Sequence, residues 1–316
     1  MSRNVLPLTV SAALLGTTAW ADVPKVATDI APVHSLVSRV MQGLGEPALI
    51  VASGASPHEY SLRPSEAGAL QDAELVFWIG PDLTPWMEDA IETLATEAAV
   101  TSLMDVDGTT ELPFREGALF EAHDHDDHDD HDDHDDHDDH DDHDDHGQYD
   151  PHAWLSLDNG AVWLNAIAAQ LSAADPDNAG TYYTNAATAR EEFDTLRTEI
   201  NDILTPVRGR NFIVFHDAYQ YFETSFDLPA SGAISISDAT DPSPARIAEI
   251  QARVKQQDVT CVLSEPQFDP KIVAAVMDGS DAKTGVLDPL GSDLEPSSEL
   301  YGNVLRNLAL ALADCL

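Results

Sequence analysis

Short apolar runs alternate along the chain with longer amphipathic stretches, and this alternation is the feature that most limits its fold. Residues 74–80 (ELVFWIG) and 211–215 (NFIVF) are apolar almost throughout, unlike a strand that faces water on one side. Runs of this kind, separated by helical patterns, indicate βαβ units. The sequence therefore predicts an α/β fold with parallel sheets that helices cover on both faces.

The predicted elements fall into two series, and a chain of 316 residues is long enough for about two domains. The first has strands over 23–29, 48–52, 74–80 and 100–106, and helices over 32–42, 64–72, 86–96 and 158–173. The second has strands over 211–215, 233–237, 260–264 and 284–287, and helices over 218–226, 244–257, 270–278 and 299–312. We predict two similar-sized lobes, over residues 22–175 and 207–316.

A single long helix is predicted to join the lobes over residues 176–206. The stretch has no glycine after Gly180 and no proline between Pro176 and Pro206, and apolar residues such as Leu196 and Ile200 recur at helical spacing. At about 1.5 Å per residue, such a helix spans about 40 Å. It is long enough to run the height of the molecule.

The first 21 residues have the organisation of a secretory signal peptide. One arginine precedes an apolar stretch, and Ala19-Trp20-Ala21 has the pattern of a cleavage site. We predict cleavage after Ala21, with no cysteine nearby to carry a lipid anchor. No later segment approaches about 18 uninterrupted apolar residues. The expected mature protein is soluble and periplasmic.

Acidic residues greatly outnumber basic ones, since 57 Asp and Glu against 15 Lys and Arg give a formal net charge of −42. Phosphate backbones and anionic lipid headgroups repel such a polyanion. Binding to nucleic acids or to anionic membrane surfaces is therefore excluded. Residues 123–146 consist only of 9 His and 15 Asp, so they carry fifteen of the negative charges.

The tract at 123–146 repeats with a period of three, which matches neither a helix nor a strand. It has no apolar residue to bury, and its like charges repel, so a disordered loop is expected. Most charged runs are only solvated surface, but imidazole is a common ligand of transition metals. We predict weak binding of several zinc ions by its histidines, which are His123, His125, His128, His131, His134, His137, His140, His143 and His146.

Four histidines lie outside the tract. His58 follows the second strand, His152 follows the tract, and His216 ends the strand NFIVF, while Asp288 ends the last strand. Ligands bind beyond the carboxyl ends of parallel strands, so the three histidines and Asp288 are expected to converge on a tetrahedral zinc ion between the lobes. Alternatively, each histidine is an ordinary polar side chain and Asp288 stabilises a turn.

His34, in the first turn of a predicted helix, is expected to cap or pack that helix. Support of the metal ligands is its less favoured role.

The two cysteines, Cys261 and Cys315, fit an exported chain. An even count in an oxidising compartment suggests one disulfide. Such a bond would pin the C-terminal helix to a core strand. The alternative is two buried free thiols.

Several motifs resemble, in order and spacing, the substrate-binding proteins of zinc-uptake ABC transporters, which belong to a metal-binding cluster that also serves manganese. They are GASPHEYSLRPSE, ELVFWIGPDLTPWM, DPHAWLS, FHDAYQYFE, EPQ and LDPLG. The resemblance covers essentially the whole mature chain. It implies two (β/α)₄ lobes joined by a long helix, with zinc in the cleft between them. The family's metal histidines match His58, His152 and His216, and many members have an aspartate ligand at the position of Asp288.

The chain departs from the family at one proposed ligand. Some zinc-binding members have a glutamate before the first histidine, where this chain has Pro57. Glu59 is expected to point elsewhere if the backbone is extended, because successive side chains alternate. That leaves Asp288 or water as the fourth ligand. A Cys261–Cys315 disulfide resembles the one typical of the zinc subgroup.

The resemblance implies a protein that is not an enzyme. It would capture periplasmic Zn²⁺ and deliver it to a membrane permease powered by a cytoplasmic ATPase. Three imidazoles and one carboxylate suit zinc, whereas manganese prefers more oxygen ligands. The tract at 123–146 is expected to gather zinc, to sense it, or to pass it on from a partner such as a periplasmic zinc chaperone. A monomer is expected.

Three other functions compete with this interpretation. The first is a manganese- or iron-binding protein of the same fold. The second is a zinc-dependent hydrolase, for which the sequence lacks the H-E-x-x-H motif that supplies ligands and a general base. The third is a zinc-dependent adhesin of the same family, which would be expected to carry a cell-surface anchor.

Overall fold

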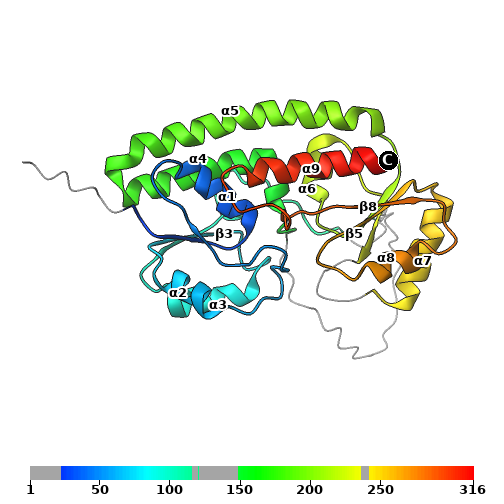
Figure 1. Cartoon of the computed structure of the whole chain (residues 1–316), viewed down its shortest axis with the longest axis horizontal. Coiled ribbons are helices and arrows are strands. Elements are labelled where there is room, and N and C mark those ends of the chain that lie inside the picture. The colour runs from blue at the N-terminus through cyan, green and yellow to red at the C-terminus, as the bar shows by residue number, and fades with distance from the viewer. Residues whose placement is uncertain (1–22, 116–119, 121–148, 236–241) are drawn as a thin grey trace, which may run out of the picture.

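The computed structural model describes residues 23–115, 120, 149–235 and 242–316. Within them lie two four-stranded parallel sheets, ordered β2-β1-β3-β4 and β6-β5-β7-β8 (Figure 1). The strands of the first sheet are β1 (Val26–Thr28), β2 (Ala48–Leu49), β3 (Leu75–Trp78) and β4 (Ala99–Ser102). Those of the second are β5 (Phe212–His216), β6 (Ala233–Ser235), β7 (Cys261–Ser264) and β8 (Lys283–Val286). The predicted α/β class with two lobes is confirmed.

Helices cover both faces of the sheets. One layer runs over both lobes and consists of α1 (Ala31–Val40), α4 (Leu157–Ala174), α5 (Ala179–Leu204) and α9 (Leu300–Cys315) (Figure 1). The opposite faces carry α2 (Pro64–Gln71) and α3 (Pro85–Leu94) on the first sheet, and α7 (Pro244–Gln256) and α8 (Pro270–Val276) on the second. The short helix α6 (Gln220–Phe226) follows β5, and 3₁₀ turns lie at Ala153–Leu155, Pro176–Asn178 and Thr205–Val207.

Burial along the strands explains why their sequences lack polar alternation. Every residue of β3 and of β5 is buried, because both strands lie inside a sheet that has helices on each face. The edge strands β4 and β8 are largely exposed. β2 is shorter than predicted, although Ile50 N and Val51 N still donate to backbone oxygens of the neighbouring strand segment.

The long helix α5 confirms the predicted connection between the lobes. It has 26 residues, and it packs against α4 and against α9. The predicted helix began at Pro176, but Pro176–Asn178 form a separate 3₁₀ turn before α5. At about 1.5 Å per residue, α5 spans about 39 Å, and Figure 1 shows it lying over both lobes.

The C-terminal helix α9 is a second link between the lobes. It packs on α1 of the first lobe and on β8 of the second. At its start, Tyr301 N donates to Ser35 Oγ (2.9 Å) and Tyr301 Oη donates to Ser156 O (3.0 Å). Gly160 permits this approach, since a Cβ atom there would lie 2.5 Å from the Tyr301 hydroxyl oxygen.

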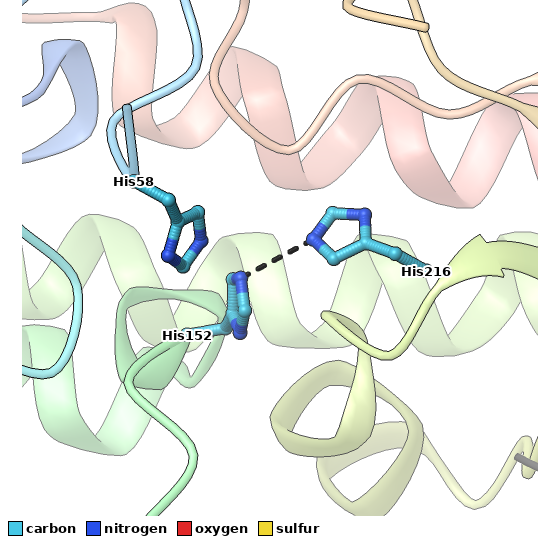
Figure 2. Close-up of side chains that lie close together, drawn as sticks. All are labelled: His58, His152 and His216. Carbon is cyan, nitrogen blue, oxygen red and sulfur yellow. Dashed lines mark hydrogen bonds between the residues drawn. The ribbon is translucent and has the colours of Figure 1, made fainter. Parts of the chain in front are cut away.

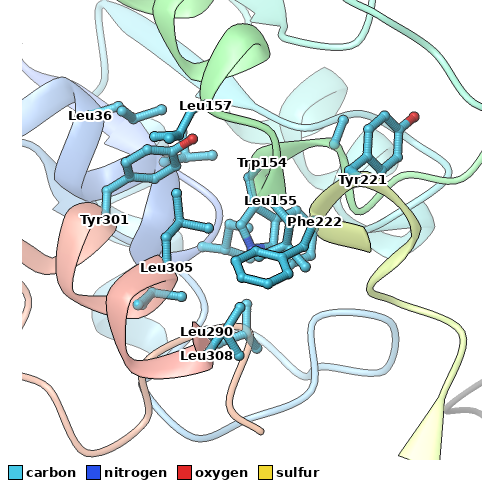
Figure 3. Packing of buried hydrophobic residues seen from close by; sticks show 14 of the residues in the cluster. Leu36, Trp154, Leu155, Leu157, Tyr221, Phe222, Leu290, Tyr301, Leu305 and Leu308 are labelled. Atoms are coloured by element: carbon cyan, nitrogen blue, oxygen red, sulfur yellow. The ribbon is translucent and has the colours of Figure 1, made fainter. Parts of the chain in front are cut away.

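One apolar core continues from lobe to lobe beneath this helical layer. It includes residues of β1, α1, α4, α5, β5, β7 and α9, together with the segments that join them. Figure 3 shows side chains of both lobes packed together, among them Leu36, Trp154, Phe222, Leu290 and Leu308. Smaller apolar clusters lie under α2 and α3 and under α7 and α8. The shared core fixes the position of one sheet edge relative to the other.

The predicted disulfide is present between Cys261 at the start of β7 and Cys315 at the end of α9. It pins the end of α9 to the second sheet. The predicted cleavage site after Ala21 and the tract at 123–146 lie outside the described residues. Among the residues that are described, every helix is too short or too polar to cross a membrane.

Replacing Cys261 and Cys315 together with alanine is expected to lower the free energy of unfolding by about 4 kcal/mol. The bond closes a loop with a sequence separation of 54, and a loop of that size stabilises by about this amount in the chain-entropy account. Urea denaturation followed by circular dichroism measures the change. Wild-type protein under dithiothreitol serves as the control and should approach the variant. Equal midpoints for oxidised and reduced wild type would contradict the expectation.

Candidate metal centre

Three predicted ligands meet where the two lobes face each other. His58 lies in the loop after β2, His152 immediately precedes a 3₁₀ turn, and His216 is the last residue of β5. One nitrogen from each ring lies within 4.8 Å of the others. Figure 2 shows His152 between the other two rings. Among the described residues, these three histidines form the group with metal-ligand geometry.

The distance between two imidazole nitrogens fits one bound cation. His152 Nε2 and His216 Nε2 are 3.3 Å apart (Figure 2). Two nitrogens that each lie about 2.0–2.1 Å from a tetrahedral zinc ion are about 3.3–3.4 Å apart. The rings of His58 and His152 are also close, with centroids 5.5 Å apart.

Two buried carboxylates orient these imidazoles from behind. Asp150 Oδ1 lies 2.7 Å from His152 Nδ1, and Glu265 Oε1 lies 2.7 Å from His216 Nδ1. An ionised carboxylate only accepts, so each pair places a proton on Nδ1 and leaves an Nε2 lone pair facing the cluster. Two lone pairs that face each other repel unless a proton or a metal ion lies between them. The carboxylates therefore prepare the two histidines for a cation.

Asp150 and Glu265 were not among the predicted site residues, although signals for both are present in the sequence. Asp150 stands two residues before His152 in the motif DPHAWLS, and its Oδ1 also accepts from His152 N. Glu265 follows β7 at the same sheet edge as His216. An acidic residue at a strand exit beside a candidate ligand is the pattern that identifies such a partner.

Burial makes the Asp150 carboxylate sensitive to nearby charge. Burial raises the pKa of Asp150 to about 7, although the His152 amide, Arg115 and the two histidines His216 and His58 lower it. A cation held by the histidines adds to these lowering contributions. Metal binding is therefore expected to favour the ionised form, which is the form that accepts from His152.

The cavity between the lobes is small, about 20 Å³, which is room for roughly one water-sized occupant. Besides the three histidines, its lining includes Trp154, Glu265, Gln267 and Leu290. Two tryptophan side chains bind the backbone of residues that line the cavity. Trp86 Nε1 donates to Pro57 O (2.7 Å), and Trp154 Nε1 donates to Pro289 O (2.9 Å). The loops that carry His58 and Asp288 are thus tied to the rest of the protein.

Asp288, the fourth predicted ligand, lies beside the cavity and stabilises the turn that follows it in the chain. Its carboxylate accepts from the backbone nitrogens of Leu290 (3.1 Å), Gly291 (2.9 Å) and Ser292 (2.6 Å). These contacts match the turn role that the sequence left as an alternative. The structure does not bring Asp288 into the group of three histidines.

His34 is buried in α1 and bonds to groups close to that helix. His34 Nε2 donates to Pro47 O (3.1 Å), and Ser38 Oγ lies 3.4 Å from His34 Nδ1. Burial lowers the pKa of His34 below its usual value. These contacts give it the packing role expected for its place in α1, away from the three clustered histidines. The nine histidines of the tract lie outside the described residues.

Comparisons with known proteins give consistent matches. A family model described as zinc-uptake complex component A, periplasmic, matches residues 26–315. The high-affinity zinc uptake system protein ZnuA of Brucella abortus is 49% identical over 304 residues, which cover 92% of this chain and 91% of that protein. The protein of the same name from Paracoccus denitrificans is 46% identical over 316 residues, which cover 97% of each chain.

Solved structures share the fold. A crystal structure of ZnuA has a TM-score of 0.74 at 24% identity and covers 93% of this chain and 99% of its own. The periplasmic zinc binding protein TroA from Treponema pallidum has a TM-score of 0.76 at 17% identity and covers 92% of this chain and 98% of its own. At these identities the likeness is one of architecture: two lobes and a long connecting helix.

Glu265→Gln is expected to weaken Zn²⁺ binding by about 10- to 100-fold, the usual cost of losing a carboxylate that supports a histidine ligand. The amide has the same shape, but it lacks the charge that makes His216 a strong donor of its lone pair. Competition with a chromophoric chelator measures the dissociation constant. Glu199→Gln is the control, since Glu199 pairs with Arg306. Equal affinities of Glu265→Gln and wild type would contradict the assigned role.

Proposed function

The chain belongs to the family described as zinc-uptake complex component A, periplasmic, and we propose that its three clustered histidines bind the zinc ion that is taken up. Family membership makes the protein a periplasmic zinc-binding component of a transport system rather than an enzyme. It also implies the permease and the ATPase of an ABC transporter as partners. We assign the residues that hold the zinc ion and the route by which zinc reaches those residues.

The observation that carries the proposal is the pair of Nε2 atoms 3.3 Å apart, each backed by a carboxylate on its Nδ1. Here His152 and His216 use Nδ1 for support and direct Nε2 at each other across the two lobes. This arrangement favours a shared cation and gives His58 a place as third ligand.

We propose zinc as the cargo in preference to manganese or iron. Three imidazoles form a site of low coordination number that suits zinc, whereas manganese prefers more oxygen ligands. Competition between Zn²⁺, Mn²⁺ and Fe²⁺ on the apo protein separates these alternatives.

Asp288 remains the proposed fourth ligand. Its neighbours Pro289 and Leu290 line the cavity, so Asp288 adjoins residues of the site in the chain. Ligation requires one oxygen to give up part of its turn hydrogen bonding, in exchange for a bond to a divalent cation. Glu59, in contrast, is exposed, which supports the expectation that it points away from the site.

We propose that the tract at 123–146 gathers zinc close to the cleft. Its two flanks are held together, because Pro113 and Tyr149 form an antiparallel bridge and Asp150 N donates to Leu112 O (2.8 Å). The second flank leads directly to His152. Zinc held weakly by the tract is thus released next to the tight site, whether it comes from solution or from a periplasmic zinc chaperone.

We further propose that the protein works as a monomer with the two lobes assigned from the sequence. These are residues 22–175 and 207–316, with a connecting helix over 176–206. The contacts of α9 with α1 and with β8 supply a second connection. A metal bound between the lobes adds a third, since His58 and His152 belong to one lobe and His216 to the other.

Removing single proposed ligands is expected to weaken the tight site. His216→Ala should raise the zinc dissociation constant by more than the about 100-fold that loss of an outer carboxylate costs. Asp288→Asn should raise it at least about 10-fold, since an amide is a poor zinc ligand. Chelator competition measures both, with His34→Gln and the exposed Asp293→Asn as matched controls. Wild-type affinity in His216→Ala would refute the proposed site, and wild-type affinity in Asp288→Asn would assign the fourth position to water.

Deleting residues 123–146 is expected to leave one tight zinc site and to remove the weak ones. Weak binding by the nine histidines of the tract is expected, because arranging a chain segment around an ion costs conformational entropy. Titration calorimetry on the full-length and deleted proteins measures the stoichiometry. Zinc bound by the tract should also leave first on acidification, because protonated imidazoles do not ligate. The same stoichiometry in both proteins would contradict a zinc-gathering role.

A further inference from the structure

A buried arginine joins the two lobes beside the candidate metal centre. Arg115 Nε donates to Asp217 Oδ1 (2.9 Å) and Oδ2 (3.1 Å), and its Nη2 also donates to Asp217 Oδ1. Arg115 Nη1 donates to Glu223 Oε2 (2.8 Å), and Nη2 donates to Glu223 Oε1 (3.1 Å). One guanidinium thus holds two carboxylates that are more than a hundred positions away in the sequence.

Both carboxylates belong to the part of the second lobe that carries His216. Asp217 is the next residue after it, and Glu223 lies in α6 and also accepts from Ala230 N (2.9 Å). Arg115 comes from the first lobe, in the segment that pairs with Tyr149 through Pro113. The ion pairs therefore join the chain next to His216 to the chain next to His152.

A tyrosine of α6, Tyr221, also connects the second lobe to the first. Tyr221 Oη donates to Asp150 O (2.8 Å) and accepts from Leu112 N (2.9 Å). Asp150 is the carboxylate that orients His152. Arg115 and Tyr221 together attach α6 to both chain segments of the first lobe that flank the site.

The ion pairs are shielded from water. The side chains of Asp217 and Glu223 are 7% and 5% exposed, and that of Arg115 is 17% exposed. The ring of Phe120 lies over the guanidinium, 3.5 Å from Cζ to the ring centroid. Burial raises the pKa of Asp217 and of Glu223, and the hydrogen bonds and charge of Arg115 oppose that rise. Without Arg115, two buried carboxylates would lose their shared cation.

We propose that Arg115 is a positioning residue for the metal site, which holds the His216 loop of one lobe against the Asp150–His152 segment of the other. The inference rests on the proposed zinc site and extends it to a residue that touches none of the ligands. The ion pairs of Arg115 involve none of the proposed zinc ligands, so they can hold His152 and His216 close together before the cation arrives. Zinc then binds without first having to order the two loops.

A positioning role and a purely electrostatic role predict opposite changes. Arg115 carries a positive charge near a site for a divalent cation, so its electrostatic effect is to repel zinc. Arg115→Met removes that charge and would tighten binding if charge alone mattered. The positioning role predicts weaker binding for this variant. Arg115→Lys keeps the charge but lacks the planar guanidinium that donates to two carboxylates at once. The positioning role therefore predicts weaker zinc binding for this variant too.

The test measures zinc affinity in the full-length protein with zinc below one equivalent, so that only the tightest site fills. Arg115→Met and Arg115→Lys are compared with Arg306→Met and Arg306→Lys as controls. Arg306 makes an equivalent two-pronged pair with Glu199 between α9 and α5. The readouts are the zinc dissociation constant, the visible absorption of bound Co²⁺, which reports coordination geometry, and the melting temperature of the apo protein.

The expected result is a dissociation constant about 10-fold higher for both Arg115 variants, comparable to the loss of other groups that support ligands. The Co²⁺ spectrum should change with it, while both Arg306 variants keep wild-type affinity and spectrum. Affinity equal to that of the Arg306 variants, or tighter binding by Arg115→Met, would overturn the inference. If Arg115→Met does not fold, Arg115→Lys alone decides between these results. His216→Ala removes a proposed ligand and leaves Arg115 unchanged. It therefore tests the zinc site separately from the positioning role of Arg115.

Discussion

The apolar core that runs from one lobe to the other is the constraint on which the metal centre depends. The helices α1, α4, α5 and α9 lie over both sheets, and their buried faces pack into this core. Because the lobes share a core, the carboxyl edges of their sheets face each other at a fixed distance. Histidines at those edges can therefore approach closely although they come from different lobes.

Charge is arranged in layers around this centre. Asp150 and Glu265 accept from the Nδ1 atoms of His152 and His216. Arg115 pairs with two other buried carboxylates, Asp217 next to His216 and Glu223 in α6, so the buried ionisable groups around the centre have partners. The chain has a net charge of −42, yet it uses one of its few arginines in this place. We propose that this acidity serves cation binding in two places, which are the tract rich in aspartate and histidine and the carboxylates that orient the imidazoles.

Much of the fold could be predicted because it depends on local patterns. The runs ELVFWIG and NFIVF became the buried strands β3 and β5, and the long pattern without proline became α5. The three histidines could be placed because strand ends of parallel sheets share an edge. The disulfide could be proposed because a two-cysteine exported chain has one possible pairing.

Other features depend on contacts between distant residues, for which no local pattern exists. The contact of Arg115 with Asp217 spans 102 positions, and that of Tyr301 with Ser35 spans 266. Glu265 stands at a recognisable strand exit, but its contact with His216 spans 49 positions and depends on the pairing of β7 with β5. For Asp288, the sequence allowed a ligand or a turn residue, and its oxygens accept from the backbone of the local Pro-Leu-Gly-Ser turn.

We propose that one zinc ion lies between His58, His152 and His216. An anomalous-difference map collected at the zinc absorption edge, on crystals of the zinc-loaded protein, shows where the ion binds. A peak is expected about 2.0–2.1 Å from one nitrogen of each of the three rings. A strongest peak elsewhere, or a peak in contact with only one of these histidines, would contradict it.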